Sequence, residues 1–315
     1  MEERQLFVKR KALGIFGQFP HERNAEQLLN YGIINVDKPR GPTSHQVSDY
    51  VQKIIGINKA GHSGTLDPHV TGVQPIALDH ASRVTQFLLT APKEYVGIMH
   101  LHREVEESVL RETVLKFIGK IQQLPPVKSA VKRQLRTREI YEFEIMEIKE
   151  KDVLFRVKCQ AGTYIRKLCT DIGKELGFGA HMAELRRTQA GPFTEKDHLV
   201  TLNDLQDAVY YYREEHNSKF LLYCLQPIEN ALKYLPTCWI LDNAIPSLTN
   251  GRDLAIPGIS QLENFRKGEI VAILTLKNEL VAIGSALLSA VEINTQQKGL
   301  AIKVNKVFME ATSAQ

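Results

Sequence analysis

Asp67 is the acidic residue of this sequence whose surroundings are best suited to chemistry. It lies in the segment GHSGTLDPHVTG, where Pro68 restricts the backbone after the carboxylate and three glycines let a ligand approach closely. A carboxylate in such a loop can act as a nucleophile or as a general base. An isolated Asp-Pro more often stabilises its own turn, but the density of glycines favours a functional role for Asp67.

Arg166, in AGTYIRKL, is the candidate cation for this carboxylate. A catalytic carboxylate that is shielded from water needs a nearby cation or several hydrogen-bond donors to stay ionised. If residues 162–166 are extended, Tyr164 and Arg166 share one face, so that the tyrosine offers a planar surface and the arginine a forked donor. If a helix has already begun there, this pairing fails.

A metal centre is the competing chemistry, because four histidines fall in one stretch of the sequence: His62, His69, His100 and His102. The motif HLH would place two imidazoles on one face of a strand. The acidic residues that follow form a charge run without the spacing of metal ligands, and strand histidines of this kind are more often structural or solvated. We therefore expect neither a metal nor another cofactor.

The elements that must position Asp67 and Arg166 combine strands and helices. A short β-rich run at 32–36 ends in DKPRGP, and an amphipathic helix follows through HQVSDYVQKIIGI with Ser44 as its expected N-cap. Further strands are predicted at EYVGIMHLH, IYEFEIMEIKE and DVLFRVKCQ, and further helices at 81–89, in TYIRKLCTDIGKEL and at 202–212. This pattern predicts an α+β fold with a mixed, largely antiparallel sheet.

The two ends of the chain differ from this central region. The first 30 residues predict an irregular N-terminal arm that packs on another part of the molecule, and beyond about residue 230 short apolar runs separated by Gly, Asn and Pro predict a small β-barrel-like domain. We therefore expect an arm at 1–30, a large domain at 31–230 and a small domain at 231–312. A length of 315 residues agrees with more than one domain.

Composition narrows the class of protein. The apolar fraction is 43 % and no window approaches the run that a membrane span needs, while the charged N-terminus and four cysteines without CxxC spacing indicate a cytoplasmic protein with free thiols. The net charge of +4 is only mildly basic. Basic clusters at 8–11, 131–138 and 185–188 nevertheless favour a polyanionic partner.

The motif around Asp67 resembles the catalytic-Asp motif of pseudouridine synthases of the bacterial tRNA pseudouridine synthase B and dyskerin types. KPRGPTSH, KEY at 93–95, AGTYIR and LRRTQAGPF resemble the other family motifs and occur in the expected order. The resemblance continues through LPPVKSAVKRQLRTREIYEFE and through NGRDLAIPGI, which resembles the PUA domain, so it covers nearly the whole chain. The arm FGQFPHER and the attached PUA segment resemble the archaeal dyskerin branch. The sequence departs from the family pattern at His69, Gln74 and Leu124 and in HREV.

The resemblance implies specific roles for individual residues. Asp67 would be catalytic and Tyr95 would stack on the flipped base, while Tyr164 and Arg166 would contact the base and the carboxylate. Lys38 and Leu185 would support the pocket, and His62 would enter the RNA stack during flipping. The expected RNA-binding residues are basic: Lys59, Lys132, Arg133, Arg136, Arg186, Arg187 and Arg252.

The function implied by the resemblance is the RNA-guided isomerisation of uridine to pseudouridine in rRNA, with tRNA as a further substrate, by the catalytic subunit of an H/ACA ribonucleoprotein. Base flipping, which costs a few kcal/mol, would bring the target uridine into the pocket. Asp67 could then attack the substrate covalently or abstract the C2′ proton, and the sequence does not choose between these routes.

The same resemblance implies the partners of the chain. They are a guide RNA, the substrate RNA and three proteins of H/ACA particles: a small zinc-ribbon-like protein, a Gly/Arg-associated β-barrel protein and a kink-turn-binding protein. Residues 131–148 resemble a thumb loop that clamps the substrate. Two alternatives remain: a stand-alone tRNA pseudouridine synthase, which would act without a guide, and a non-catalytic RNA-binding scaffold, which would have no need of Asp67, Tyr95 and Arg166 together.

Overall fold

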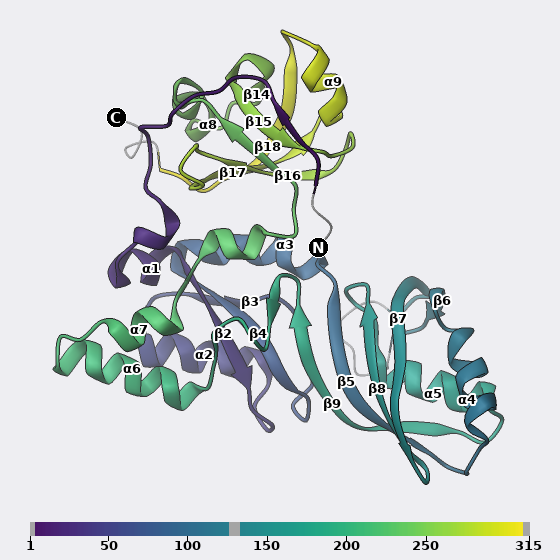
Figure 1. Cartoon of the computed structure of the whole chain (residues 1–315). Coiled ribbons are helices and arrows are strands. Elements are labelled where there is room, and N and C mark those ends of the chain that lie inside the picture. Colours follow the sequence, from purple (N-terminus) through teal and green to yellow (C-terminus); the bar gives the residue numbers. More distant parts are fainter. Residues whose placement is uncertain (1–3, 126–132, 311–315) are drawn as a thin grey trace. The chain divides into compact units, whose positions relative to one another are not determined.

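The computed structural model describes residues 4–125 and 133–310 and divides the chain into two compact units (Figure 1). One unit comprises 34–78 and 82–224, and the other comprises 1–33, 79–81 and 225–315. The C-terminal unit therefore includes the N-terminal segment as well as the chain from residue 225 onward. No helix among the described residues is long and apolar enough to cross a membrane.

A large mixed sheet organises the first unit. Its strand order over the described residues is β11-β2-β4-β9-β5-β8-β7-β6, with three short strands beside this path. The strands are β2 Gly32–Lys38, β3 Ala60–His62, β4 Thr71–Leu78, β5 Lys93–Leu101, β6 Gly119–Gln123, β7 Arg136–Lys149, β8 Asp152–Cys159, β9 Ala180–Ala190, β10 Phe193–Thr194, β11 Leu199–Val200 and β12 Gln226–Pro227. Antiparallel pairs dominate, whereas β4 pairs with β9 and β11 with β2 in parallel. The expected mixed, largely antiparallel sheet is confirmed.

Helices cover this sheet and supply its core. They are α2 Ser44–Ile55, α3 Thr85–Thr90, α4 Glu107–Leu115, α5 Ile165–Glu175, α6 Leu202–Glu214 and α7 Lys219–Cys224. Buried residues of α4 and α5 pack with those of β5, β8 and β9 in one apolar cluster. Burial of apolar surface on this scale is the main force that holds the sheet and helices together.

The start of α2 differs from the expectation by one residue. Thr43, not Ser44, is the N-cap, because the Thr43 hydroxyl accepts the backbone N–H of Gln46 and the Gln46 side chain accepts the backbone N–H of Thr43. Ser44 is the first helical residue, and its hydroxyl is instead used inside the molecule. The prediction that Ser44 caps the helix was therefore wrong.

Strand β9 was missed by the sequence patterns, although it lies between β4 and β5 in the large sheet. Its sequence AHMAELRRTQA contains charged residues at positions that a simple alternation would leave apolar. The described part of the expected thumb loop is mostly the strand β7, while residues 126–132 lie outside the described residues.

The second unit contains a seven-stranded sheet over its described residues, in the order β1-β15-β13-β16-β17-β18-β14. Its strands are β1 Leu6–Val8, β13 Thr237–Ile240, β14 Leu254–Ala255, β15 Ile259–Glu263, β16 Ile270–Leu274, β17 Leu280–Ala286 and β18 Leu300–Val307, and its helices are α1 Ala25–Tyr31, α8 Ile245–Thr249 and α9 Ala290–Thr295. The N-terminal segment pairs with this sheet, because Phe7 of β1 lies opposite Leu262 of β15. The segment expected to be irregular thus contributes the strand β1 and the helix α1.

Candidate active site around Asp67

The loop between β3 and β4 presents Asp67 to solvent and buries its neighbours. Leu66 and Val70 are buried in the apolar core, and the hydroxyl of Ser44 accepts the backbone N–H of Leu66 at 2.7 Å. The Asp67 side chain itself is 53 % exposed. Anchoring the residues on both sides of an exposed carboxylate places it accurately without burying its charge.

Lys38, at the end of β2, holds the other side of this loop. Its side chain is fully buried, and its ammonium group donates to the carbonyls of Pro39, Pro68 and Val70 at 2.9, 3.2 and 2.9 Å. Burial lowers the pKa of Lys38, and nearby Arg187 lowers it further, whereas Asp67 raises it. Lys38 therefore ties the end of β2 to the turn that follows Asp67, which agrees with a supporting role.

Arg166 pairs with Asp67, as expected, but not from an extended backbone. An Nη2 to Oδ2 distance of 2.5 Å joins the two side chains, which are 56 % and 53 % exposed. Helix α5 begins at Ile165, so Arg166 lies in its first turn and Tyr164 is the N-cap residue. The condition for Tyr164 and Arg166 to share one strand face, an extended backbone over 162–166, is therefore not met, because the helix begins before Arg166.

Tyr164 is held by its backbone. Its N–H donates to the side-chain oxygen of Gln123 at 2.9 Å, and the Gln123 amide donates back to the Tyr164 carbonyl at 3.2 Å. This reciprocal pair joins β6 to the start of α5 and fixes the direction in which the helix leaves the sheet. The fixed helix start determines where Arg166 can reach.

Tyr95 and Leu185 lie on neighbouring strands, β5 and β9, and both are buried in the core cluster that includes Leu66 and Val70. Tyr95 lies opposite Arg187 in the β5–β9 pair. Burial raises the pKa of the Tyr95 phenol, and Arg187 partly offsets this effect. Tyr95 is thus part of the floor beneath the Asp67 loop.

Two adjacent arginines of β9 correct the expectation of phosphate contacts. Arg187 is 1 % exposed, so its guanidinium cannot reach a phosphate in this structure. Arg186 donates to both carboxylate oxygens of Asp37 at 2.9 Å and to Glu195 at 2.6 Å, which neutralises its charge. The corrections have one physical cause: successive strand residues point to opposite faces, and here one face is buried and the other is acidic.

His62, expected to enter the RNA stack, is half-buried at the end of β3. The backbone N–H of Gly64 approaches its Nδ1 at 3.4 Å, and its ring lies edge-on to that of His45. Burial lowers the pKa of His62, and His45 and Arg187 lower it further. The imidazole is therefore predisposed to be neutral, which suits insertion between bases better than a phosphate contact.

The other expected RNA-binding residues are divided between the two units. Lys59, Arg133 and Arg252 are exposed, and Arg136 is half-buried at the start of β7. Arg252 belongs to the C-terminal unit, and Lys132 lies outside the described residues. Their roles stay predictions.

The two histidines of HLH each contact another side chain. His100 Nδ1 contacts Asp152 at 2.7 Å, and His102 Nε2 contacts His181 Nδ1 at 3.1 Å. Within residues 4–125 and 133–310, no group of three or more His, Cys, Asp or Glu side chains has the geometry to hold a metal ion.

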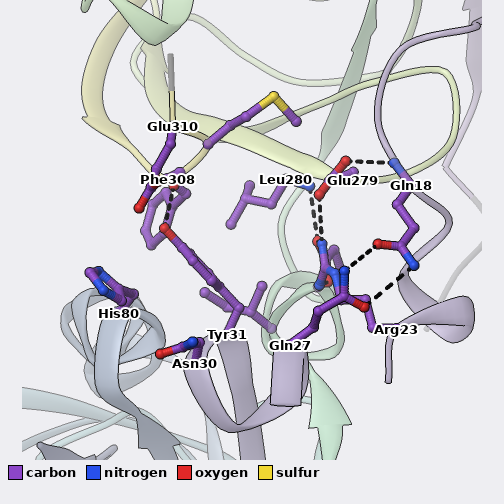
Figure 2. A pocket seen from close by; sticks show the side chains of 13 residues that line it. Gln18, Arg23, Gln27, Asn30, Tyr31, His80, Glu279, Leu280, Phe308 and Glu310 are labelled. Atoms are coloured by element: carbon purple, nitrogen blue, oxygen red, sulfur yellow. Dashed lines mark hydrogen bonds and ion pairs between the residues drawn. The ribbon is translucent and has the colours of Figure 1, made fainter. Parts of the chain in front are cut away.

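A separate cavity of about 290 Å³ lies in the C-terminal unit (Figure 2). Arg23 lies beside it and forms ion pairs with Glu229 at 2.8 Å and Glu279 at 3.2 Å. On another side, Tyr31 stacks on His80 and donates to the Phe308 carbonyl at 2.9 Å. Local sequence patterns gave none of these residues a role of its own, and several of the contacts join distant positions, such as Arg23 and Glu229, which are 206 residues apart.

Four family models match successive parts of the chain. They are the "DKCLD (NUC011) domain" over 2–48, the "TruB family pseudouridylate synthase (N terminal domain)" over 52–165, the "tRNA pseudouridylate synthase B C-terminal domain" over 166–233 and the "PUA domain" over 236–308. Asp67 and Tyr95 fall within the second match, and Arg166 opens the third. Together the matches span nearly all of the sequence.

Similar proteins also cover nearly the full length. A protein of Methanothermobacter thermautotrophicus named "Probable tRNA pseudouridine synthase B" is 53 % identical over 94 % of this chain and 91 % of its own length. The "Crystal Structure of a Cbf5-Nop10-Gar1 Complex" matches with a TM-score of 0.95 and 47 % identity, over 99 % of this chain and 96 % of that one. The "Structure of H/ACA RNP bound to a substrate RNA containing 2'-deoxyuridine" matches with a TM-score of 0.93 and 45 % identity, over 99 % and 96 %. The chain therefore belongs to the TruB family of pseudouridylate synthases, in the branch that carries DKCLD and PUA domains.

Proposed function

We propose that this chain isomerises uridine to pseudouridine in rRNA under the direction of a guide RNA, as the catalytic subunit of an H/ACA ribonucleoprotein. The observation that carries the proposal is the Asp67–Arg166 pair on an anchored loop, in a chain that is 45 % identical over 99 % of its length to a protein in a substrate-bound H/ACA particle. We extend the proposal to tRNA as a further substrate, because curated relatives carry tRNA in their names.

The reaction needs a carboxylate and no change of oxidation state. The N1–C1′ bond of uridine breaks with its electron pair on the uracil, the ring turns, and C5 forms the new bond to C1′. The C5 hydrogen then leaves as a proton while N1 takes one up, so that the atoms and charges balance. Asp67 either bonds to C1′ while the ring is detached or removes and returns the C2′ proton. Both routes need the ionised carboxylate, and the guanidinium of Arg166 orients it.

The open position of the Asp67–Arg166 pair suits an RNA substrate. About half of each side chain is exposed in the free protein, where water screens their attraction. A flipped uridine would displace this water, and the lower local dielectric would strengthen every electrostatic interaction with the reacting atoms. The attraction between Asp67 and Arg166 would therefore become strongest when the substrate is bound.

The pocket around the flipped base would be formed from the core side. Tyr95 would stack on the uracil ring and Leu185 would pack beside it, since the two residues lie on adjacent strands below the Asp67 loop. Tyr95 is nearly covered in the free protein, so we expect its ring to contact substrate with one face only. Lys38 supports the loop from behind.

Guide and substrate RNA would be held outside this pocket. The exposed Lys59 and Arg133 offer phosphate contacts in the catalytic unit, and Arg252 offers one in the PUA domain. Target choice would come from base pairing with the guide, while the protein recognises RNA shape and backbone.

The proposed protein partners are those of an H/ACA particle. They are a zinc-ribbon-like protein and a Gly/Arg-associated β-barrel protein, in agreement with the names Nop10 and Gar1 in the similar complex, and a kink-turn-binding protein. We place the chain in the cytoplasm, because its four buried free cysteines suit a reducing compartment.

Tritium release from RNA labelled at C5 of the target uridine tests the proposal. The complete particle should release tritium only with a matched guide, and Asp67→Ala and Asp67→Asn should abolish release. Asp152→Asn is the control, because Asp152 is a comparably exposed carboxylate that is paired with His100. Release from naked tRNA without a guide would identify a stand-alone tRNA enzyme, and RNA binding without release would identify a scaffold.

A further inference from the structure

Three buried cations lie beneath the Asp67 loop. Lys38, Lys93 and Arg187 are 0 %, 5 % and 1 % exposed, and within the described residues none of them forms an ion pair with a carboxylate. Their donors go to backbone carbonyls instead. Lys38 is explained by its three contacts to the loop, but Lys93 and Arg187 have no part in the chemistry outlined above.

Arg187 connects the loop to Tyr95. Its Nε donates to the Val73 carbonyl at 2.7 Å, and its Nη2 approaches the Gly64 carbonyl at 3.4 Å. Tyr95 lies opposite Arg187 in the β5–β9 pair, and the guanidinium lowers the pKa of the phenol against the effect of burial. One planar group therefore holds β4 and the glycine three residues before Asp67, beside the aromatic ring of the proposed base pocket.

Lys93 lies beside Arg187 under the same glycine. Its ammonium group donates to the carbonyls of Leu88 at 3.0 Å and Ala91 at 2.6 Å. A Cβ atom at Gly64, which has a φ of +129°, would lie 3.8 Å from both the Arg187 Nη1 and the Lys93 Cε. The two cations are thus neighbours, although each repels the other and both are shielded from water.

Burying two like charges side by side is unfavourable unless something negative compensates for them. Burial lowers the pKa of Arg187, and burial and then Arg187 lower the pKa of Lys93. A neutral residue could fill either position without this penalty. The charge is most useful if it acts on a negative group that is present only during the reaction, and the uracil ring is such a group when it leaves with the N1–C1′ electron pair.

We propose that Arg187 and Lys93 form a buried positive floor that stabilises the negative charge on the detached uracil, with Arg187 also positioning Tyr95 and the Asp67 loop. The inference rests on the proposed function. Tyr95 is the only side chain that the proposal places between these cations and the base, so the charges act through one aromatic ring in a low-dielectric interior. Both are positioning residues, because neither touches the substrate.

The first experiment separates charge from packing at Lys93. In the complete particle, Lys93→Met should lower the single-turnover rate constant for pseudouridine formation about tenfold, while Lys93→Arg keeps most of the rate because it keeps the charge. The dissociation constant for substrate RNA should not change in either variant. Lys158→Met is the control, since Lys158 lies on the neighbouring strand β8, opposite Glu94, and is only partly buried beside Glu142. Equal loss in both Lys93 variants would overturn the proposal.

The second experiment tests the charge on the leaving group directly. A 5-fluorouridine target leaves more easily as an anion, because fluorine withdraws electron density. Its disappearance should therefore be slowed less by Lys93→Met than the reaction of uridine is. If both substrates lose rate by the same factor, the floor does not act on the leaving group.

Arg187 is tested without depending on a variant that fails to fold. Tyr95→Phe removes only the hydroxyl group of the phenol and keeps the ring. Arg187→Lys keeps the positive charge on a shorter side chain. If Arg187 acts through Tyr95, the double variant should lose less rate than the product of the two single losses. Full additivity would refute the positioning role. A particle that remains active with Asp67→Ala would instead refute the proposed function, so the two failures are distinguishable.

Discussion

Two arginine side chains with little exposure, one in each unit, differ in their partners and in the direction in which their pKa is shifted. Arg23 in the C-terminal unit lies between two carboxylates, and Glu229 and Glu279 outweigh the effect of burial and raise its pKa. Arg187 in the catalytic unit donates to backbone carbonyls and, within the described residues, forms no ion pair, and burial lowers its pKa. A buried cation that is paired with carboxylates within the fold contributes to its stability. A buried cation without a carboxylate partner can still attract a negative charge that develops on the substrate.

The difference extends to the surroundings of each arginine. The carboxylates of the Arg23 cluster are themselves satisfied: Glu229 accepts the Leu280 N–H at 2.9 Å and Glu279 accepts the Gln18 N–H at 2.7 Å (Figure 2). Within residues 4–125 and 133–310, Arg187 forms no ion pair with a carboxylate, and Asp67 pairs instead with Arg166 at the surface. We therefore expect substitutions in the first cluster to change stability and those in the second to change catalysis.

The largest expected effect is that of Asp67→Asn. It should lower the rate of pseudouridine formation by a factor of about 10³ or more, because the amide can neither bond to C1′ nor accept a proton. The free energy of unfolding of the catalytic unit should hardly change, since Asp67 is half exposed. Single-turnover assays and urea unfolding measure the two effects, and a large loss of stability would place Asp67 with the structural charges.

Arg166→Gln should have the next largest effect on the rate. Losing the guanidinium that orients Asp67 should slow the chemical step about 10²-fold, with little change in stability because the pair is exposed. Arg156→Gln is a close control, since Arg156 also pairs with a carboxylate, Glu144, at 2.5 Å and is similarly exposed. Comparable rate loss in the two variants would mean that the Asp67 pair has no special role.

Arg23→Met tests the structural side of the comparison. It leaves Glu229 and Glu279 without their cation and should lower the free energy of unfolding of the C-terminal unit by about 2 kcal/mol. The rate constant of the folded particle should be unchanged. Chemical unfolding followed by Trp239 fluorescence reports this unit, because Trp239 lies on β13. A lower rate constant in fully folded particles that carry Arg23→Met would contradict the purely structural role of Arg23.

Substitution of Lys93 should have the smallest effect on the rate of pseudouridine formation, and this effect should depend on pH. Burial first, then Arg187, lowers the pKa of Lys93 to about 7, while the Cys159 thiol opposes this shift. The ammonium group is present below that pH, so the rate should fall as pH rises through about 7, whereas Lys93→Arg should stay flat.

Stability should change with pH in the opposite direction. Between pH 7 and about 10, the unfolded chain keeps a proton on Lys93 that the folded chain has lost. The free energy of unfolding should therefore rise with pH by at most about 1.4 kcal/mol per unit, relative to Lys93→Met. A difference that does not depend on pH would show that Lys93 is not titrating in this range.

Several features of the site were predictable because they depend on nearby residues. The glycines and Pro68 around Asp67 indicate an ordered loop from local backbone preferences, and alternating apolar residues predict β5 and β8 from their own sequences. The same local signals missed β9 and α4, in which charged and apolar residues do not alternate cleanly. The exact start of α2 was also missed, because Thr43 and Ser44 are both good N-cap residues and only the hydrogen bonds distinguish them.

The sequence by itself determined the family and the order of the domains and singled out Asp67 as the proposed catalytic carboxylate, because motifs and periodicity are properties of consecutive residues. Only the tertiary structure decided that Arg187 is buried while Arg186 pairs with Asp37. Adjacent residues of a strand point to opposite faces, but which face is buried depends on β4 and β5, whose residues lie about 90 positions or more earlier in the chain. Long-range strand pairing therefore determines which charges can support catalysis.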